Sequence, residues 1–422
     1  MRMDAGVSAF MLVCTMLVLL MTPGLAFFYG GLTRRKNVGN TMAMVFVSIG
    51  IVALTWTACG WSLAYGGDGE NPIFGGFDQM MLLGSASEAL VEADGSSGYP
   101  SLVDIAFQMA FCMITTAIIT GGVAGRMKFG AIVAFLAAWT ILVYPILAHM
   151  VWGGEGSLVG GIIGALDFAG GDVVHISSGL TALVLAILVG KRVGFGAMNY
   201  RPHNVPFIAL GAALLWFGWF GFNAGSAFAP DGVAALALLN TVCASGAGVA
   251  SWLVVERIVV KKPTLVGAAT GLVAGLVAIT PAAGFVEPWA AILFGIVVSP
   301  VCFWAISWLK RKLGYDDALD AFGCHCVGGI LGGVLTGIFC VPGLSWTEFG
   351  GLLYTGDATL LGAQVLGIVI TIAFVGICDV IIGLIVKACF KGSLRVSAES
   401  EAQGLDVSEH GESAYPAFVG LD

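Results

Sequence analysis

The sequence predicts an all-α polytopic membrane protein with eleven transmembrane helices, and three observations lead to this fold class. The 422 residues are 58% hydrophobic and 10% charged, with a mean hydropathy of +0.95. A soluble domain carries about 25% charged residues, so this composition excludes one. The 18 Lys and Arg residues gather in short clusters between long apolar stretches. Acidic residues dominate the other connections between those stretches.

The basic clusters predict the topology. Apart from Arg2 they are Arg34-Arg35-Lys36; Arg126 with Lys128; Lys191-Arg192 with Arg201; Arg257 with Lys261-Lys262; Lys310-Arg311-Lys312; and Lys387, Lys391 and Arg395. Basic loops stay on the cytoplasmic side of a membrane, so two crossings fit between successive clusters, with an acidic loop at the far turn. An odd number of crossings then places the N-terminus outside and the C-terminus inside.

The apolar stretches have the length of about 20 residues that crosses a hydrocarbon core of about 30 Å. The expected spans are 7–32, 39–66, 101–124, 129–150, 172–190, 206–227, 233–256, 264–281, 289–309, 321–341 and 359–386. We interpret the first as a helix and not a cleaved signal peptide, because its apolar run ends in a basic stop-transfer pattern. The predicted domains are a membrane domain over 1–392 and a cytoplasmic tail over 393–422. The polar composition of the tail favours disorder, with docking on the inner loops as the alternative.

The order of the spans indicates an internal repeat. Five spans precede Lys191 and five more precede the acidic loop near Glu348, so the first half starts outside and the second starts inside. Two five-helix halves of opposite orientation are typical of inverted-repeat transporters, whose site lies where the halves meet. We expect the eleventh span to brace the bundle. Many of the 62 glycines have small-xxx-small spacing, which favours close helix packing.

Two histidines occupy pseudo-equivalent spans. His175 lies near the start of span 172–190 and His325 lies in span 321–341. An ionisable residue within a membrane span indicates a functional site by default, and a hydrogen bond between helices is the alternative. The Cys324-His325-Cys326 run does not favour a metal site, because consecutive helical side chains point about 100° apart. The ten cysteines are scattered and indicate no disulfide framework.

Aromatic residues form a second group near the outer span ends: Phe107, Phe111, Trp152 and Phe222. Aromatic faces hold a small cation without a fixed anion that would trap it, and a hydroxyl such as that of Ser226 would accept a hydrogen bond from the cation. An interfacial aromatic belt is the alternative for any one of them.

Six segments, in order along the chain, resemble the ammonium transporter family (Amt/Rh). They are TPGLAFFYGGL (22–32), AHMVWGG (148–154), GALDFAGGDVVH (164–175), WFGFNAGS (219–226), DAFGCH (320–325) and GLDVSEHGE (404–412). The resemblance therefore covers nearly the whole chain. One departure from it is Asp379, an acid within span 359–386 where an apolar residue is expected.

The resemblance implies a homotrimer in the cell (plasma or inner) membrane, with one pore in each protomer and no cofactor or metal. It implies a contact between the tail and a cytoplasmic PII-type signal protein, besides contacts with membrane lipid. It also implies roles for individual residues: ammonium recruitment by Phe107, Trp152 and Ser226; a phenyl gate of Phe111 and Phe222; pore histidines His175 and His325; and the structural carboxylate Asp167.

These residues suggest an ammonium transporter that binds NH4+ outside, removes a proton and conducts NH3, with the proton relayed and transport electrogenic. The alternatives are a passive neutral-gas channel of the Rh type and an ammonium sensor that signals through its tail. A membrane enzyme is the weakest reading, because no nucleophile–base pair or metal-ligand set occurs at membrane depth. The net charge of -8 gives no indication of nucleic-acid binding, because the excess acid lies in outer loops and the tail.

Overall fold

The computed structural model describes residues 4–85, 100–198 and 200–415. Within these ranges, eleven helices are long and apolar enough to cross a membrane, which confirms the predicted fold class. They are α1 (Ala5–Leu32); α2 (Val38–Thr55) continued by α3 (Trp61–Tyr65); α5 (Ser101–Ile119); α6 (Phe129–Leu142) with α7 (Tyr144–Trp152); η6 (Gly171–Ile176) with α8 (Ser177–Val189); α9 (Val205–Gly225); α10 (Gly232–Val259); α11 (Leu265–Ile279); α12 (Pro288–Trp304) with α13 (Lys310–Leu313); η9 (Phe322–Cys326) with α14 (Val327–Phe339); and α16 (Thr359–Cys389).

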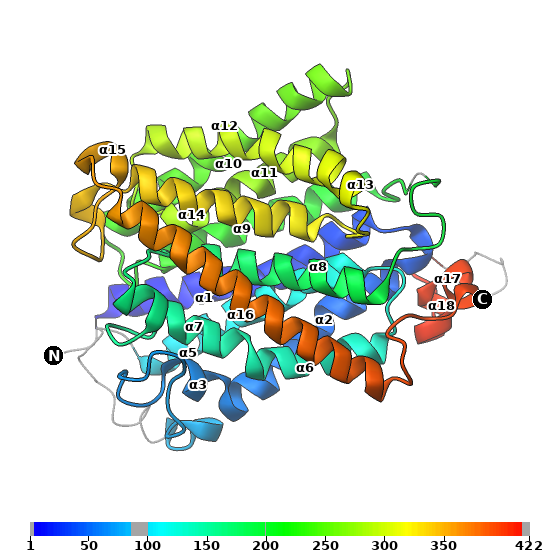
Figure 1. The fold of residues 1–422 in the computed structure, drawn as a ribbon, viewed down its shortest axis with the longest axis horizontal. Helices are drawn as coiled ribbons and strands as arrows, with labels where there is room; N and C mark the ends of the chain where they lie inside the picture. Colours follow the sequence, from blue (N-terminus) through cyan, green and yellow to red (C-terminus); the bar gives the residue numbers. More distant parts are fainter. Residues whose placement is uncertain (1–3, 86–99, 199, 416–422) are drawn as a thin grey trace.

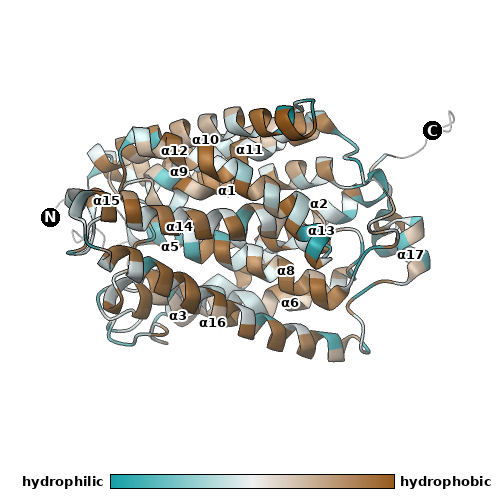
Figure 2. Ribbon diagram, turned by 45° about the horizontal axis from the view of Figure 1, so that its top comes forward, coloured by the Kyte–Doolittle hydropathy of each residue, from teal (hydrophilic) through white to brown (hydrophobic). Residues whose placement is uncertain are grey.

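The long helices form a single bundle whose middle is hydrophobic and whose two ends are hydrophilic (Figure 2). Apolar side chains in the middle of the bundle match the hydrocarbon core of a bilayer, and the polar ends match its two surfaces. Helices suit this environment, because each satisfies its own backbone hydrogen bonds where water is absent. Helix α16 runs obliquely across α8 and α6 (Figure 1), as expected for a bracing eleventh span. Helix α1 begins at the end of the bundle where α15 (Leu352–Thr355) lies, and the last described residues, up to 415, lie at the opposite end.

Glycines allow the first helices of the two halves, α1 and α9, to pack closely. A Cβ atom on Gly24 would lie 2.9 Å from the Cβ of Leu214, and one on Gly218 would lie 2.6 Å from the carbonyl oxygen of Leu17. The contacts run antiparallel, since residues early in α1 meet residues late in α9. Backbones this close gain dispersion contacts, which is how helices associate in lipid.

The polar tail is docked over the residues that the structure describes. Two short helices, α17 (Ala398–Gln403) and α18 (Leu405–His410), pack at the end of the bundle that carries the basic clusters. The Leu405 amide donates to Asn37 Oδ1 at 3.0 Å, and the Asn40 amide donates to Asp406 Oδ1 at 2.8 Å. Specific bonds between backbone and side chains thus hold a segment whose composition favours disorder. The last part of the predicted tail, 416–422, lies outside the described residues.

Asp379 is fully buried in α16 and faces the interior of the bundle. Its Oδ1 accepts a hydrogen bond from Trp139 Nε1 in α6 at 3.0 Å. The carboxyl group therefore has a partner within its own chain, which explains how the apolar span accommodates it. Asp379 does not face a neighbouring subunit, because its side chain has no exposed surface.

Candidate functional site

Three cavities follow one another through the bundle. The outer cavity, of about 880 Å³, is lined by Phe111 and Trp152 among others. A central cavity of about 10 Å³ is lined by Phe222, His175 and His325 within apolar walls. His325 also lines the inner cavity, of about 290 Å³. The central volume is close to the minimum of about 10–15 Å³ that holds one water-sized molecule, so only a very small solute fits there.

Two stacked phenyl rings separate the outer cavity from the central one. The ring centroids of Phe111 and Phe222 lie 4.0 Å apart, and the angle between the ring planes is 16°. Both side chains are buried. On the outer side, the Phe107 ring lies 4.8 Å from that of Phe111, and the Trp152 ring meets Phe111 edge-on at 6.2 Å. Ser226 Oγ donates to the Phe222 carbonyl at 2.8 Å, which leaves its lone pairs free to accept. These five residues therefore form one group.

The two histidines meet in the central cavity. The Nδ1 atoms of His175 and His325 lie 3.3 Å apart, and the imidazoles are 1% and 5% exposed, respectively. A hydrogen bond between the two Nδ1 atoms needs the proton on one of them, so the acceptor ring carries its own proton on Nε2. The Nε2 atom of His175 is buried and has no hydrogen-bond partner among the described residues. The Trp219 ring stacks on the His175 ring at 5.4 Å and fixes its plane.

Asp167 holds the π-helical turn η6 that carries His175. Its Oδ1 accepts from the amides of Gly170 at 2.7 Å and Gly171 at 2.6 Å, and its Oδ2 accepts from those of Asp172 at 2.8 Å and Val173 at 3.3 Å. Burial raises the pKa of Asp167, and the four amide bonds oppose that rise. With both oxygens occupied, this carboxyl group organises the backbone.

Asp317 occupies the matching position before His325, and the sequence analysis missed it. It accepts from the amides of Ala321 at 3.1 Å and Phe322 at 2.8 Å, at the start of η9. Burial raises the pKa of Asp317 to about 6. A signal was available in the sequence, because each acid precedes its histidine by the same spacing in the two halves. Trp219 was also missed, and no local pattern distinguishes it from the other tryptophans.

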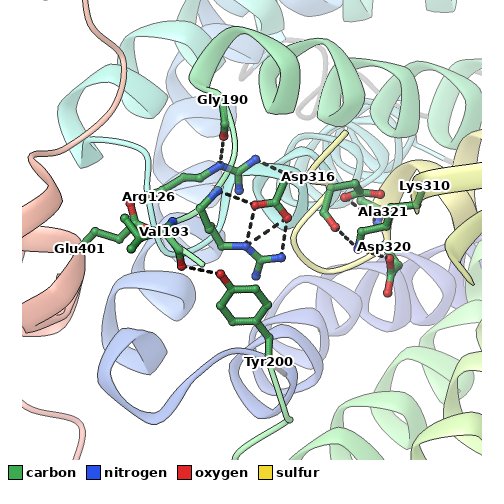
Figure 3. Close-up of polar contacts among 11 residues, drawn as sticks. Arg126, Gly190, Val193, Tyr200, Lys310, Asp316, Asp320, Ala321 and Glu401 are labelled. Atoms are coloured by element: carbon green, nitrogen blue, oxygen red, sulfur yellow. Dashed lines mark hydrogen bonds and ion pairs between the residues drawn. The ribbon is translucent and has the colours of Figure 1, made fainter. Parts of the chain in front are cut away.

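An ionic cluster at the basic end of the bundle anchors the loop before Asp317 (Figure 3). Arg192 forms a bidentate ion pair with Asp316, with the shortest N–O distance at 2.6 Å. Arg126 is fully buried, its Nε donates to the Gly190 carbonyl at 2.7 Å, and burial lowers its pKa to about 10. Glu401 from the tail accepts from the Val193 amide at 2.7 Å. The tail therefore contacts the loop that joins the two halves.

No group of three His, Cys, Asp or Glu side chains is placed to hold a metal ion in the parts of the chain that the structure describes. Cys324 and Cys326 are buried on either side of His325. Cys326 packs against Ile176 and Ile368, so its thiol fills the bundle as a small apolar side chain would.

Comparisons with known proteins agree over nearly the full chain. The model of the Ammonium Transporter Family matches residues 9–415. An ammonium transporter of Bacillus subtilis is 49% identical over 413 residues, covering 98% of this chain and 99% of the relative. One of Aquifex aeolicus is 47% identical, covering 98% of this chain and 94% of the relative.

Two solved structures have the same fold. Mep2 of Saccharomyces cerevisiae has a TM-score of 0.86 at 33% identity, covering 94% of this chain and 89% of its own. A sensor Amt protein has a TM-score of 0.86 at 29% identity, covering 96% of this chain and 98% of its own.

Proposed function

Because the chain belongs to the ammonium transporter family, we propose that it recruits NH4+ at the aromatic group, removes one proton and conducts NH3 past the paired histidines. The protein is a multi-pass membrane transport protein for ammonium and not an enzyme. The observation that carries the finer mechanism is the order of the sites: a wide outer cavity, a closed phenyl pair, and a narrow apolar cavity bordered by two imidazoles.

The physical argument begins with desolvation. An intact ammonium ion in the dry central cavity would lose its water shell at a cost of several kcal/mol, whereas neutral ammonia enters apolar surroundings cheaply. Aromatic faces attract the cation at the outer side without trapping it. Potassium has no proton to lose, so a central cavity that passes only the neutral species excludes it.

The imidazole pair gives the separated proton a path. When the Nδ1–H of His175 donates to His325 Nδ1, the free Nε2 of His175 accepts the proton that the substrate loses. The Nδ1 proton of His175 then passes to His325 Nδ1, and His325 releases its own Nε2 proton towards the inner cavity, which it also lines. The relay makes transport electrogenic. The test replaces His175 or His325 with leucine in proteoliposomes and records current on a solid-supported membrane together with [14C]methylammonium uptake. Loss of current is expected, and an undiminished, ammonium-selective current in both variants would refute the relay.

A passive neutral-gas pore of the Rh type is the alternative within transport. It predicts uptake without charge movement in the same experiment. A sensor is the second candidate, favoured by the similarity to the sensor Amt protein and by the contacts of the tail with the loop between the halves. A sensor would bind methylammonium but show little flux.

The same proposal includes the oligomeric state of the protein, its membrane, its topology and its partner. We infer a homotrimer in the cell membrane with the N-terminus outside, a membrane domain over 1–392, and a tail over 393–422 that meets a cytoplasmic PII-type signal protein. Native mass spectrometry in lipid-like detergent measures the oligomer, and a monomer there would contradict it. Cysteine labelling from each side of intact cells measures the orientation.

A further inference from the structure

His149 lies near the end of α7 that borders the outer cavity, and its ring joins three parts of the chain. The residue is buried, with 1% of its surface exposed. Its Nδ1 lies 2.7 Å from the carbonyl oxygen of Ala64 in α3, and its Nε2 lies 2.6 Å from that of Asn71 in the following loop. Both distances are those of short hydrogen bonds. The ring therefore connects α7 to α3 and to this loop.

The two contacts of the ring need a proton on both of its nitrogens. A backbone carbonyl oxygen accepts hydrogen bonds and cannot donate one. A neutral imidazole has a single N–H, so its second nitrogen would point a lone pair at the other carbonyl oxygen. The imidazolium form has an N–H on each nitrogen and satisfies both carbonyl groups. The geometry thus favours the charged ring.

The surroundings of the ring also favour a positive charge. Ala64 lies in the last turn of the helix that runs over Arg35–Tyr65. The final carbonyl groups of a helix have no partner within it and carry a partial negative charge, which stabilises a cation placed there. The two stretches that meet at the ring, 37–125 and 129–190, contain several acidic residues but no Lys or Arg. A cation at His149 therefore has no like charge from either stretch against it.

The titratable groups on neighbouring elements leave the two carbonyl contacts in place. Helix α7 packs against α3, α6, η6 and the short π-helical segment η5 (Leu158–Ile162). Tyr65 on α3 and Asp172 and His175 on η6 titrate, whereas α6 and η5 contain no such residue. The adjoining connections contribute acids: Asp68, Glu70, Asp78 and Glu155. Among the described residues, only the two carbonyl groups bond to the ring of His149.

We propose that His149 is a doubly protonated imidazolium that fastens the 66–79 loop to α7 and positions Trp152. The ring packs against the residue that follows Trp152, since a Cβ atom on Gly153 would lie 2.7 Å from His149 Nδ1. The loop also meets the chain beyond α7, where the Leu158 amide donates to the Pro72 carbonyl at 2.9 Å. A ring that lost one proton would leave one carbonyl group unsatisfied and free either α3 or the loop.

This role concerns the outer cavity, because Trp152 and the glycines of η5 line it. The charge state of the ring does not depend on what the pore carries. Its effect on uptake rests on the proposed function, through the part of Trp152 in recruitment. The two parts are therefore tested by separate measurements.

Nitrogen NMR of the detergent-solubilised protein with 15N-labelled histidine measures the charge state. A histidine in water loses its charge above about pH 6.5, so spectra at about pH 8 distinguish the two forms. His203 is the matched control: its Nδ1 lies 3.1 Å from the Thr33 carbonyl oxygen and its Nε2 lies 3.1 Å from Tyr415 Oη. A hydroxyl group donates as well as accepts, so a neutral ring satisfies both contacts of His203.

At about pH 8 His149 should show two protonated nitrogens and His203 only one. The signals are assigned by replacing each of the other four histidines with glutamine in turn, so the result does not depend on the folding of a His149 variant. An unprotonated nitrogen in His149 at this pH would overturn the proposal.

Hydrogen exchange and uptake of the His149→Gln variant measure the consequence. The amides of 66–79 should exchange about tenfold faster, because one charge-assisted bond is lost, whereas His203→Gln should leave them unchanged. KM for methylammonium should rise about tenfold with Vmax within about twofold, because a displaced Trp152 holds the cation less well. Unchanged exchange over 66–79 would overturn the fastening of the loop, and an unchanged KM would overturn the positioning of Trp152. A wild-type protein without uptake would overturn the proposed function and leave the NMR result standing.

Discussion

Replacing Asp167 by alanine should loosen the start of the fifth span more than replacing Asp317 loosens the tenth. Asp167 accepts four backbone amides and Asp317 accepts two, and both carboxyl groups are buried. An amide left buried without a partner costs roughly 1–3 kcal/mol. At the lower limit the loss is about 4 kcal/mol for Asp167→Ala and about 2 kcal/mol for Asp317→Ala.

Hydrogen exchange measured by mass spectrometry on peptides that cover 168–176 and 318–326 reports this loss locally. The amides that lose their acceptor should exchange about a thousandfold faster in Asp167→Ala and about thirtyfold faster in Asp317→Ala. Asp231 provides the control, because it caps α10 through two amides at 2.9 Å but is exposed, so water replaces it. Equal exchange in the Asp167 and Asp317 variants, or a larger effect for Asp231→Ala, would refute the reasoning.

Two further predictions concern stability. Burial alone would raise the pKa of Asp316, but the bonds and charge of Arg192 outweigh it and hold that pKa below its ordinary value. The pair therefore stabilises the fold above about pH 4 and loses this contribution as the pH falls further, and Arg192→Gln should flatten the dependence of Tm on pH below that value. A variant whose Tm falls with acid as the wild type does would contradict this. Gly211→Leu should separate α1 from α9, because its side chain would meet the backbone of Phe28, and size-exclusion chromatography should show aggregation. Gly246→Ala, which meets nothing within 4 Å, should remain monodisperse.

The sequence alone was sufficient for the number and approximate limits of the spans. A bilayer requires long apolar segments and places the basic residues at one end of them, and both signals are local. The glycines at helix contacts and the spacing from Asp167 to His175 are also local, and the same spacing would have revealed Asp317 before His325. The histidine positions indicated a shared site because two inverted halves bring equivalent residues together.

The contacts between distant residues depended on the tertiary structure. Phe111 stacks on Phe222 from another helix, and the two Nδ1 atoms that meet belong to residues 150 positions apart. No local pattern identifies Trp139 as the partner of Asp379. The docking of the polar tail likewise depends on residues that are distant in the sequence. The physical reason is that composition and periodicity determine whether a helix enters the membrane, whereas the pairing of side chains depends on which helices the packed glycines bring side by side.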